Sequence, residues 1–176
     1  MKKIFLALFF VTFTTIIFAQ NMKVTSSSIT FKIKNAGFNV AGKFQGFNGN
    51  LNFDPNNLAG SSIAASVDTK TIDTDNNLRN RHLKEKEEFF NVAKFPTIEM
   101  KSSKFEKSGD TFMGTFDLTM KGITKAVKVP FSVSQTGNSM TFTSTFTINR
   151  RDWQVGGSSW MMSDTATITV SVTSKQ

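Results

Sequence analysis

The sequence predicts an all-β protein, an antiparallel barrel of about eight strands with one helical insertion. From Ser28 onward, apolar residues recur at every second position, which is typical of strands with one buried face. The connections between these segments are short and rich in turn residues, which favours antiparallel neighbours. Glycines interrupt several of the segments, as the bends of a closed sheet require.

The first half of the chain contains four alternating segments, at residues 29–33, 38–53, 63–67 and 98–102. In the second segment the apolar phase that includes Phe44 differs from the phase that includes Phe47. A change of phase inside one strand predicts a β-bulge, here at Gln45-Gly46, where a long strand bends.

The second half contains four more alternating segments, at residues 112–120, 127–133, 140–148 and 166–172. The last two carry threonine on the face opposite their apolar residues. Turn residues separate the segments, for example Lys121-Gly122. The alternation is clearest here, and it predicts strands five to eight.

One segment departs from the period of two. From Asp75 to about Phe90, β-branched residues are few, and Leu78, His82 and Leu83 lie on one side of a helix. Pro96 then restarts extended chain. We therefore expect a helix inserted between the third and fourth strands.

The N-terminus has the pattern of a secretory signal peptide, residues 1–19. Lys2 and Lys3 precede an uncharged apolar run, and Ala19-Gln20 offers a small residue for cleavage. Residues 20–176 are then expected to form one exported domain, periplasmic or secreted. The chain has no cysteine, so packing and hydrogen bonds must stabilise it without disulfides.

The sequence gives little support for a catalytic site or a metal site. There is no cysteine and no G-x-S-x-G elbow, and His82 is the only histidine. His82 and Glu85 would supply two metal ligands at most. Asp73, Asp75 and Asn77 resemble the start of a calcium loop, but the sixth and twelfth positions are occupied by Leu78 and Lys84. We therefore predict no metal and no cofactor, and interpret this stretch as a turn or helix cap.

The formal net charge is +8. The lysines are spread along outward strand positions, which argues against a nucleic-acid partner. A basic surface is compatible with transient contact with an anionic membrane.

Nineteen phenylalanines and no tyrosine indicate large apolar faces. Eight phenylalanines occupy predicted inward positions and are the candidate wall of a lumen: Phe31, Phe44, Phe53, Phe112, Phe116, Phe131, Phe142 and Phe146. Glycine and alanine at neighbouring inward positions leave volume beside the rings. The pattern fits both an ordinary filled core and an apolar tunnel that holds a ligand.

Several stretches together resemble the YceI-like family of exported lipid-binding proteins. The segments are ITFKIKNAGFNVAGKFQGFNGNLNFDPNNLAGSSIAASVDTKTIDT (29–74), RNRHLKEKEEFFNVAKFPTIEMKSSKF (79–105), GTFDLTMKGITKAVKVPF (114–131) and FTINRRDWQVG (146–156). The resemblance implies an extended, lipocalin-like antiparallel barrel that binds long apolar chains such as isoprenoid quinones, polyprenyl lipids or fatty-acid amides. Trp153-Gln154 and the stretch from Trp160 to Met162 depart from the family pattern.

These expectations combine into a non-enzymatic protein that carries or sequesters an amphiphilic isoprenoid-type lipid. A fatty-acid or fatty-amide binder in stress protection is the alternative. An enzyme acting on a lipid-derived substrate, with His82 as acid or base, is a third reading. Whether the chain forms a homodimer stays open.

A polar rim is expected at the barrel end beside the helix. Arg79 and His82 are three apart, hence on one helical face, and Asn149 and Arg150 could join them near a lipid head group. Each residue also has a structural alternative. Arg79 could pair with an acid, His82 could anchor the insertion, and Arg150 could pair with Asp152 or Asp164.

Overall fold

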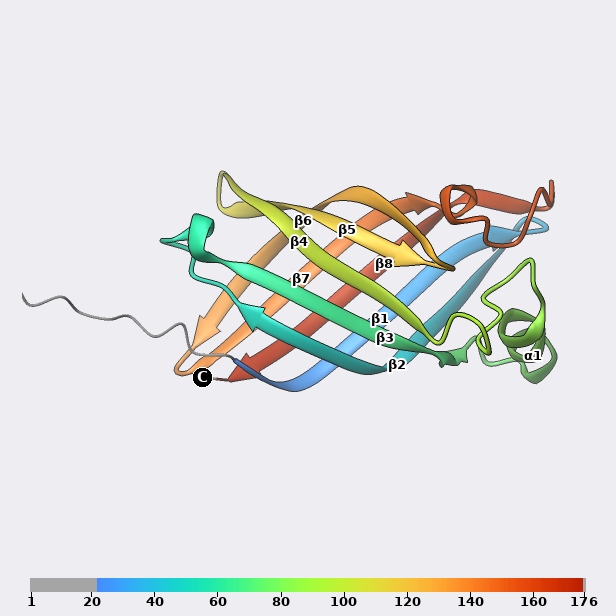
Figure 1. Ribbon diagram of the computed structural model, residues 1–176, viewed down its shortest axis with the longest axis horizontal. Coiled ribbons are helices and arrows are strands. Elements are labelled where there is room, and N and C mark those ends of the chain that lie inside the picture. The colour runs from blue at the N-terminus through green and yellow to red at the C-terminus, as the bar shows by residue number, and fades with distance from the viewer. Residues whose placement is uncertain (1–21, 176) are drawn as a thin grey trace, which may run out of the picture.

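The computed structural model describes residues 22–175, which form a closed barrel of eight antiparallel strands with one α-helix (Figure 1). The predicted fold class is thereby confirmed, whereas the predicted signal peptide lies outside the described residues. The strands are β1 (Lys23–Asn35), β2 (Phe38–Asn52), β3 (Ser62–Asp73), β4 (Thr97–Ser108), β5 (Thr111–Met120), β6 (Ile123–Thr136), β7 (Ser139–Asn149) and β8 (Met162–Lys175). Within residues 22–175 we find no helical segment with the length and hydropathy of a membrane span.

Each strand pairs with the next one in the chain, and β8 pairs with β1 to close the barrel. The connections therefore gather at two opposite ends (Figure 1). The end we call the helix end carries α1 (Asn77–Glu85), the 3₁₀ helix η2 (Arg150–Trp153) and the β1–β2 and β5–β6 turns. The other, the hairpin end, carries η1 (Leu58–Gly60), the β4–β5 and β6–β7 hairpins, the start of β1 and the end of β8.

The bulge predicted in β2 is present. The register between β2 and β3 shifts on both sides of Gln45, and Gly46 has a φ of +66°. The Thr71 hydroxyl satisfies the freed backbone, because it accepts from the Gln45 N–H at 2.8 Å and donates to the Gln45 carbonyl at 3.1 Å. The bulge lets Phe44 and Phe47, of opposite parity in the sequence, both line the barrel interior.

The helical insertion is shorter than predicted, because α1 ends at Glu85 and not near Phe90. Asn76 caps its start, accepting a hydrogen bond from the Arg79 N–H at 2.9 Å. At Lys86 the backbone becomes extended. The chain then folds back so that the Phe90 N–H donates to the Leu83 carbonyl at 3.0 Å, and the Phe90 side chain is buried. Burial of this ring at the barrel end competes with continuation of an exposed helix.

Candidate functional site

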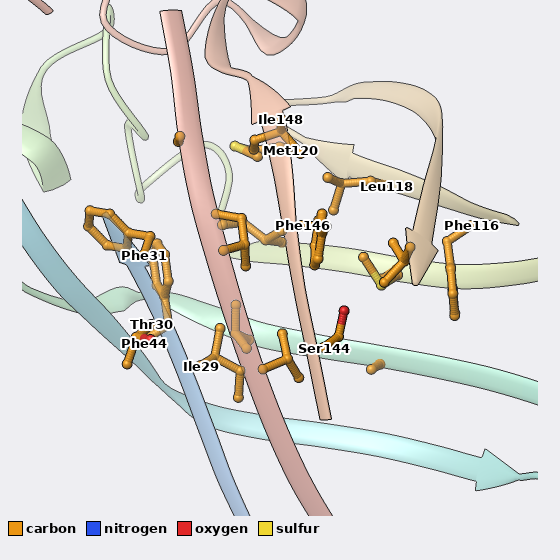
Figure 2. A pocket seen from close by; sticks show the side chains of 18 of the residues that line it. Ile29, Thr30, Phe31, Phe44, Phe116, Leu118, Met120, Ser144, Phe146 and Ile148 are labelled. Atoms are coloured by element: carbon orange, nitrogen blue, oxygen red, sulfur yellow. The ribbon is translucent and has the colours of Figure 1, made fainter. Parts of the chain in front are cut away.

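The barrel encloses a cavity of about 260 Å³, close to the size of small-ligand pockets. All but six of its lining residues are apolar, the exceptions being Thr30, Ser66, Glu99, Thr143, Ser144 and Arg150. Figure 2 shows side chains from β1, β2, β5 and β7 pointing into this space. The sequence left open whether the core is filled or hollow, and the structure shows a hollow one.

Phe31 and Phe44 form one side of the cavity, on the paired strands β1 and β2, with ring centroids 5.6 Å apart (Figure 2). The Phe31 ring lies directly over Gly42, its partner in the strand register. A Cβ at Gly42 would collide with that ring. The glycine therefore gives the phenylalanine a place against the wall, which leaves the centre of the barrel free.

The cavity is blind at the hairpin end. Phe53 lies 5.1 to 5.6 Å, centroid to centroid, from four other rings, those of Phe105, Phe112, Phe131 and Phe142, in near-perpendicular contacts. We call these five residues the aromatic plug, and all five are buried. The lumen therefore does not run through the barrel.

Of the eight phenylalanines predicted to line the lumen, six do so, and Phe53 and Phe112 do not. Both have the expected inward orientation, but they lie in the plug beside the ends of β2 and β5 at the hairpin end. Two other plug residues, Phe131 and Phe142, also line the cavity. The sequence reasoning missed Phe105, the plug residue on β4, because its parity is opposite to that of Ile98 and Met100. A register shift between Ser102 and Lys104 brings Phe105 to the inner face.

At the helix end the cavity is bordered by side chains from the connecting segments, namely Leu83, Phe89, Phe90, Val155 and Met162. Lys121, in the β5–β6 turn, ties two of these segments together. Its ammonium group donates to the Glu87 carbonyl at 2.7 Å and to the Gln154 carbonyl at 2.9 Å. Burial lowers the pKa of Lys121, while the nearby Glu88 and Glu87 carboxylates oppose this shift. These hydrogen bonds hold the segments that border the cavity at the helix end in fixed positions.

Arg150 is the one predicted rim residue that lines the cavity. Its side chain is only 3% exposed, and its guanidinium group contacts five backbone carbonyls, those of Val155, Gly157, Ser159, Met162 and Ser163, at 2.7 to 3.3 Å. It also pairs with Asp164 at 3.3 Å, which agrees with one of the predicted structural alternatives. Burial lowers the pKa of Arg150, and Asp164 opposes that shift. All five N–H groups have acceptors within the protein.

Arg79 fastens α1 to the end of β3. Its guanidinium donates to the Thr74 hydroxyl at 2.8 Å and to the Thr74 carbonyl at 2.6 Å. Asn80 adds to the same junction, accepting from the Thr74 N–H and hydroxyl and donating to Asp73. Arg79 therefore contacts a buried threonine and not the acidic residue that its structural alternative predicted.

His82 and Asn149 do not line the cavity. His82 is half-buried on α1, and its side chain forms no hydrogen bond or ion pair within the described part of the chain. The Asn149 side chain caps η2 by accepting from the Arg151 N–H at 3.0 Å. The structure thus does not bring the four predicted rim residues together at one point.

The barrel wall has a seam between β6 and β7. Their register stops at Phe131 and Ser144, so that residues 123–130 and 145–149 form no pairs with each other. Pro130, which has no N–H to donate, marks the break, and the Ser144 hydroxyl donates to its carbonyl at 2.6 Å. An outer hollow meets the cavity wall here, since both are lined by Phe131, Thr143, Ser144 and Val170.

The cavity wall can surround a hydrocarbon, but it offers little for covalent chemistry. Its lining contains no histidine and no lysine. Every buried side-chain N or O atom in residues 22–175 has a hydrogen-bond partner. No group of three histidine, aspartate or glutamate residues in that range could hold a metal. The arrangement favours binding of an apolar group by contact alone.

Comparison with known proteins shows where this architecture recurs. The YceI-like domain matches residues 21–174. A UPF0312 protein of Yersinia pestis (strain Pestoides F) is 35% identical over 111 residues, which are 62% of this chain and 57% of that protein. The chain therefore spans little more than half the length of that relative.

Several solved structures are similar in fold. The crystal structure of Burkholderia cenocepacia BcnA has a TM-score of 0.79 and 26% sequence identity, covering 84% of this chain and 95% of that one. A polyisoprenoid-binding domain from Saccharophagus degradans, implicated in plant cell wall breakdown, has a TM-score of 0.71. It covers 89% of this chain and 98% of its own, and at 13% identity it shows the fold alone.

Proposed function

We propose that this chain, which belongs to the YceI-like family, binds the hydrocarbon part of an amphiphilic lipid inside its barrel. The observation that carries the proposal is the blind, apolar cavity of about 260 Å³. The description of the Saccharophagus relative as polyisoprenoid-binding supports an isoprenoid-type chain. A protein with such a cavity would carry or sequester its lipid without converting it.

The hydrophobic effect supplies the affinity. Each CH₂ group removed from water contributes about 0.8 kcal/mol, so ten buried carbons would contribute roughly 8 kcal/mol before the costs of association. A single neutral hydrogen bond to a head group adds only about 1 kcal/mol. The apolar wall therefore sets how tightly a lipid binds, and the head group has a smaller effect.

The blind end limits chain length. From Val172 to Met162, β8 has eleven residues, and the ten steps between them extend about 33 Å along the strand and about 25 Å along a barrel axis with ordinary strand tilt. A long polyprenyl chain would have to fold or protrude at the helix end. A chain of medium length fits without folding, which is why a fatty acid or fatty amide remains the second candidate.

The head group would lie at the helix end, outside the wall. Arg150 cannot serve it as a free donor, because its N–H groups are already engaged. Its role in our proposal is to hold the segment from Val155 to Asp164 in place beside the cavity. Head-group recognition then falls to groups exposed around the cavity border.

The test is to identify lipid in protein recovered from the periplasmic fraction of cells that express residues 1–176, which also tests the proposed export. Mass spectrometry of the extract should show about one lipid per protein. Ala65 lines the cavity, whereas Ala64 beside it is exposed. The variant Ala65→Phe should therefore lose the lipid, because its ring fills the lumen, and the matched variant Ala64→Phe should keep it. Wild-type protein without any lipid, or equal loading of both variants, would refute the proposal.

A further inference from the structure

The large apolar side chains that are exposed within residues 22–175 all lie at the helix end. They are Phe38, 77% exposed, Leu78, 54%, Trp160, 90%, and Met161, 51%. Phe38 begins β2, Leu78 is in the first turn of α1, and Trp160 and Met161 immediately precede β8 (Figure 1). Scattered exposed apolar residues are ordinary, but a concentration at one end of a barrel indicates a surface with a partner.

Phe38 and the Trp160-Met161 pair belong to one local structure. The Ala36 N–H donates to the Met161 carbonyl at 2.8 Å, which links the β1–β2 turn to the segment before β8. Asn35 pairs with Phe38 on one side and with Met162 on the other. Phe38 and the Trp160-Met161 pair, which we call the apolar tips, are therefore held beside each other. They lie next to Met162, which borders the cavity.

The same end is basic. Its connecting segments, residues 36–37, 74–96, 121–122 and 150–161, contain eight lysines and arginines against five acidic residues. The connections of the hairpin end, residues 53–61, 109–110 and 137–138, contain two acidic residues and no basic one. Arg81, Lys84 and Lys94 form no ion pair within the described part of the chain.

We propose that the helix end docks on an anionic lipid bilayer, with Phe38, Trp160 and Met161 inserted at the interface and Arg81, Lys84 and Lys94 over the lipid phosphates. This inference rests on the proposed function, because the cavity border lies at the same end. Tryptophan favours the interface between membrane and water, and each basic residue near an anionic surface adds to the attraction. A docked barrel would pass a lipid between bilayer and cavity with little exposure of its tail to water.

The chemistry of the surface favours a bilayer over a protein partner. The exposed apolar side chains come from three segments of the chain, and Arg81 and Lys84 lie on the same helix as Leu78. Stable protein interfaces instead carry a contiguous apolar centre depleted of charge. Isolated tips need no complementary partner surface when they enter a fluid lipid phase.

The first experiment measures association of the full mature protein with vesicles of phosphatidylethanolamine and phosphatidylglycerol in equal parts, by co-sedimentation. The double variant Phe38→Ser, Trp160→Ser should bind about tenfold more weakly or worse, since burial of one large apolar side chain alone corresponds to that factor. Both positions are exposed, so circular dichroism and melting should be unchanged. Trp153 is buried, so a blue shift of emission on vesicle addition should come from Trp160.

Charge is tested with a matched pair of variants. Arg81→Gln, Lys84→Gln should weaken vesicle binding by about fivefold for each charge removed, and added salt should have a similar effect. The control Lys23→Gln, Lys107→Gln removes two charges near the hairpin end and should bind like the parent. Vesicles of phosphatidylcholine should bind the parent more weakly than anionic vesicles.

A titration with cis-parinaric acid, without vesicles, reports separately on the lumen, and the tip and charge variants should bind it like the parent. A parent that binds this fatty acid but no anionic vesicle overturns the docking proposal and leaves the proposed function standing. Vesicle binding that none of the helix-end substitutions weakens also overturns it. So does a parent dimer that the Trp160→Ser change separates, because this surface would then join two copies of the chain.

Discussion

At the scale of single residues, Arg150 shows how a charge can lie beside an apolar cavity. Its guanidinium is buried among backbone carbonyls of the segment before β8 and of the first two residues of β8, and Asp164 supplies the opposite charge. A buried cation is costly unless it is paired and hydrogen-bonded, and here both conditions hold. Arg150 therefore orders a segment whose sequence has little regular pattern of its own.

Replacement of Arg150 by methionine should lower the free energy of unfolding by about 3 kcal/mol, because several buried carbonyls lose their donor. Its neighbour Arg151 provides the control. Arg151 also pairs with Asp164, at 2.6 Å, but its side chain is 45% exposed. Arg151→Met should therefore cost less than about 1 kcal/mol. Urea unfolding measures both values. Equal losses would argue against a stabilising role for the buried hydrogen bonds of Arg150.

At the scale of elements, the junction of β3 with α1 decides how the helix is held. Asp73, Thr74, Arg79 and Asn80 form one hydrogen-bonded group at the point where the strand ends. Thr74 is buried, so its polar atoms depend on Arg79 and Asn80 as hydrogen-bond partners. The insertion is thus anchored at its start by the Thr74 junction and near its end by the buried ring of Phe90.

This junction should make stability depend on pH. The hydrogen bond from Asn80 lowers the pKa of Asp73 below its ordinary value of 3.8, and the Asp75 N–H and Lys43 add to the effect. A lowered pKa in the folded state gives stability that is present above the ordinary value and is lost as the pH falls through the folded one. Melting temperatures measured from about pH 5 down to about pH 2 should therefore fall less steeply for Asp73→Asn than for the wild type.

The control for that measurement is Asp110→Asn. Asp110 is exposed in the β4–β5 hairpin and accepts no side-chain hydrogen bond within residues 22–175. This variant should keep the wild-type dependence on pH. If both variants gave the same slope as the wild type, the Asp73 junction would have no part in acid unfolding.

At the scale of the whole molecule, the two ends of the barrel differ in construction. The hairpin end is filled by the aromatic plug, and the helix end is bordered by connecting segments that Lys121 and Arg150 fasten. In the function that we propose, the hydrocarbon chain of the lipid extends from the helix end toward the aromatic plug. The polar end of the lipid then faces the exposed apolar side chains and the basic residues of the helix end.

Opening the plug should change both stability and cargo. Phe53→Ala should cost about 3 to 5 kcal/mol, as for other buried phenylalanines, and should extend the cavity toward the hairpin end. Lipids extracted from this variant should have longer chains than those from the wild type. Phe38→Ala, at an exposed position, should change stability by less than about 0.5 kcal/mol and leave the chain length unaltered. A longer cavity without longer lipids would mean that the plug does not limit the cargo.

The sequence by itself determined the strands, the bulge at Gln45-Gly46 and the inward parity of the phenylalanines. These features depend on local geometry, since the side chains of a strand alternate with a period of two. The end of the helix was not determined in this way, because Phe90 leaves the helix to reach a burial site that other segments create.

Only the tertiary structure decided which inward rings line the cavity and which close it. Phe31 and Phe53 have the same local pattern, but the tilt and stagger of the strands set their heights along the barrel axis. The same holds for Arg150, whose carbonyl partners come from a segment without periodicity. Strand periodicity specifies the face on which a side chain lies, whereas its neighbours across the barrel depend on how all eight strands close.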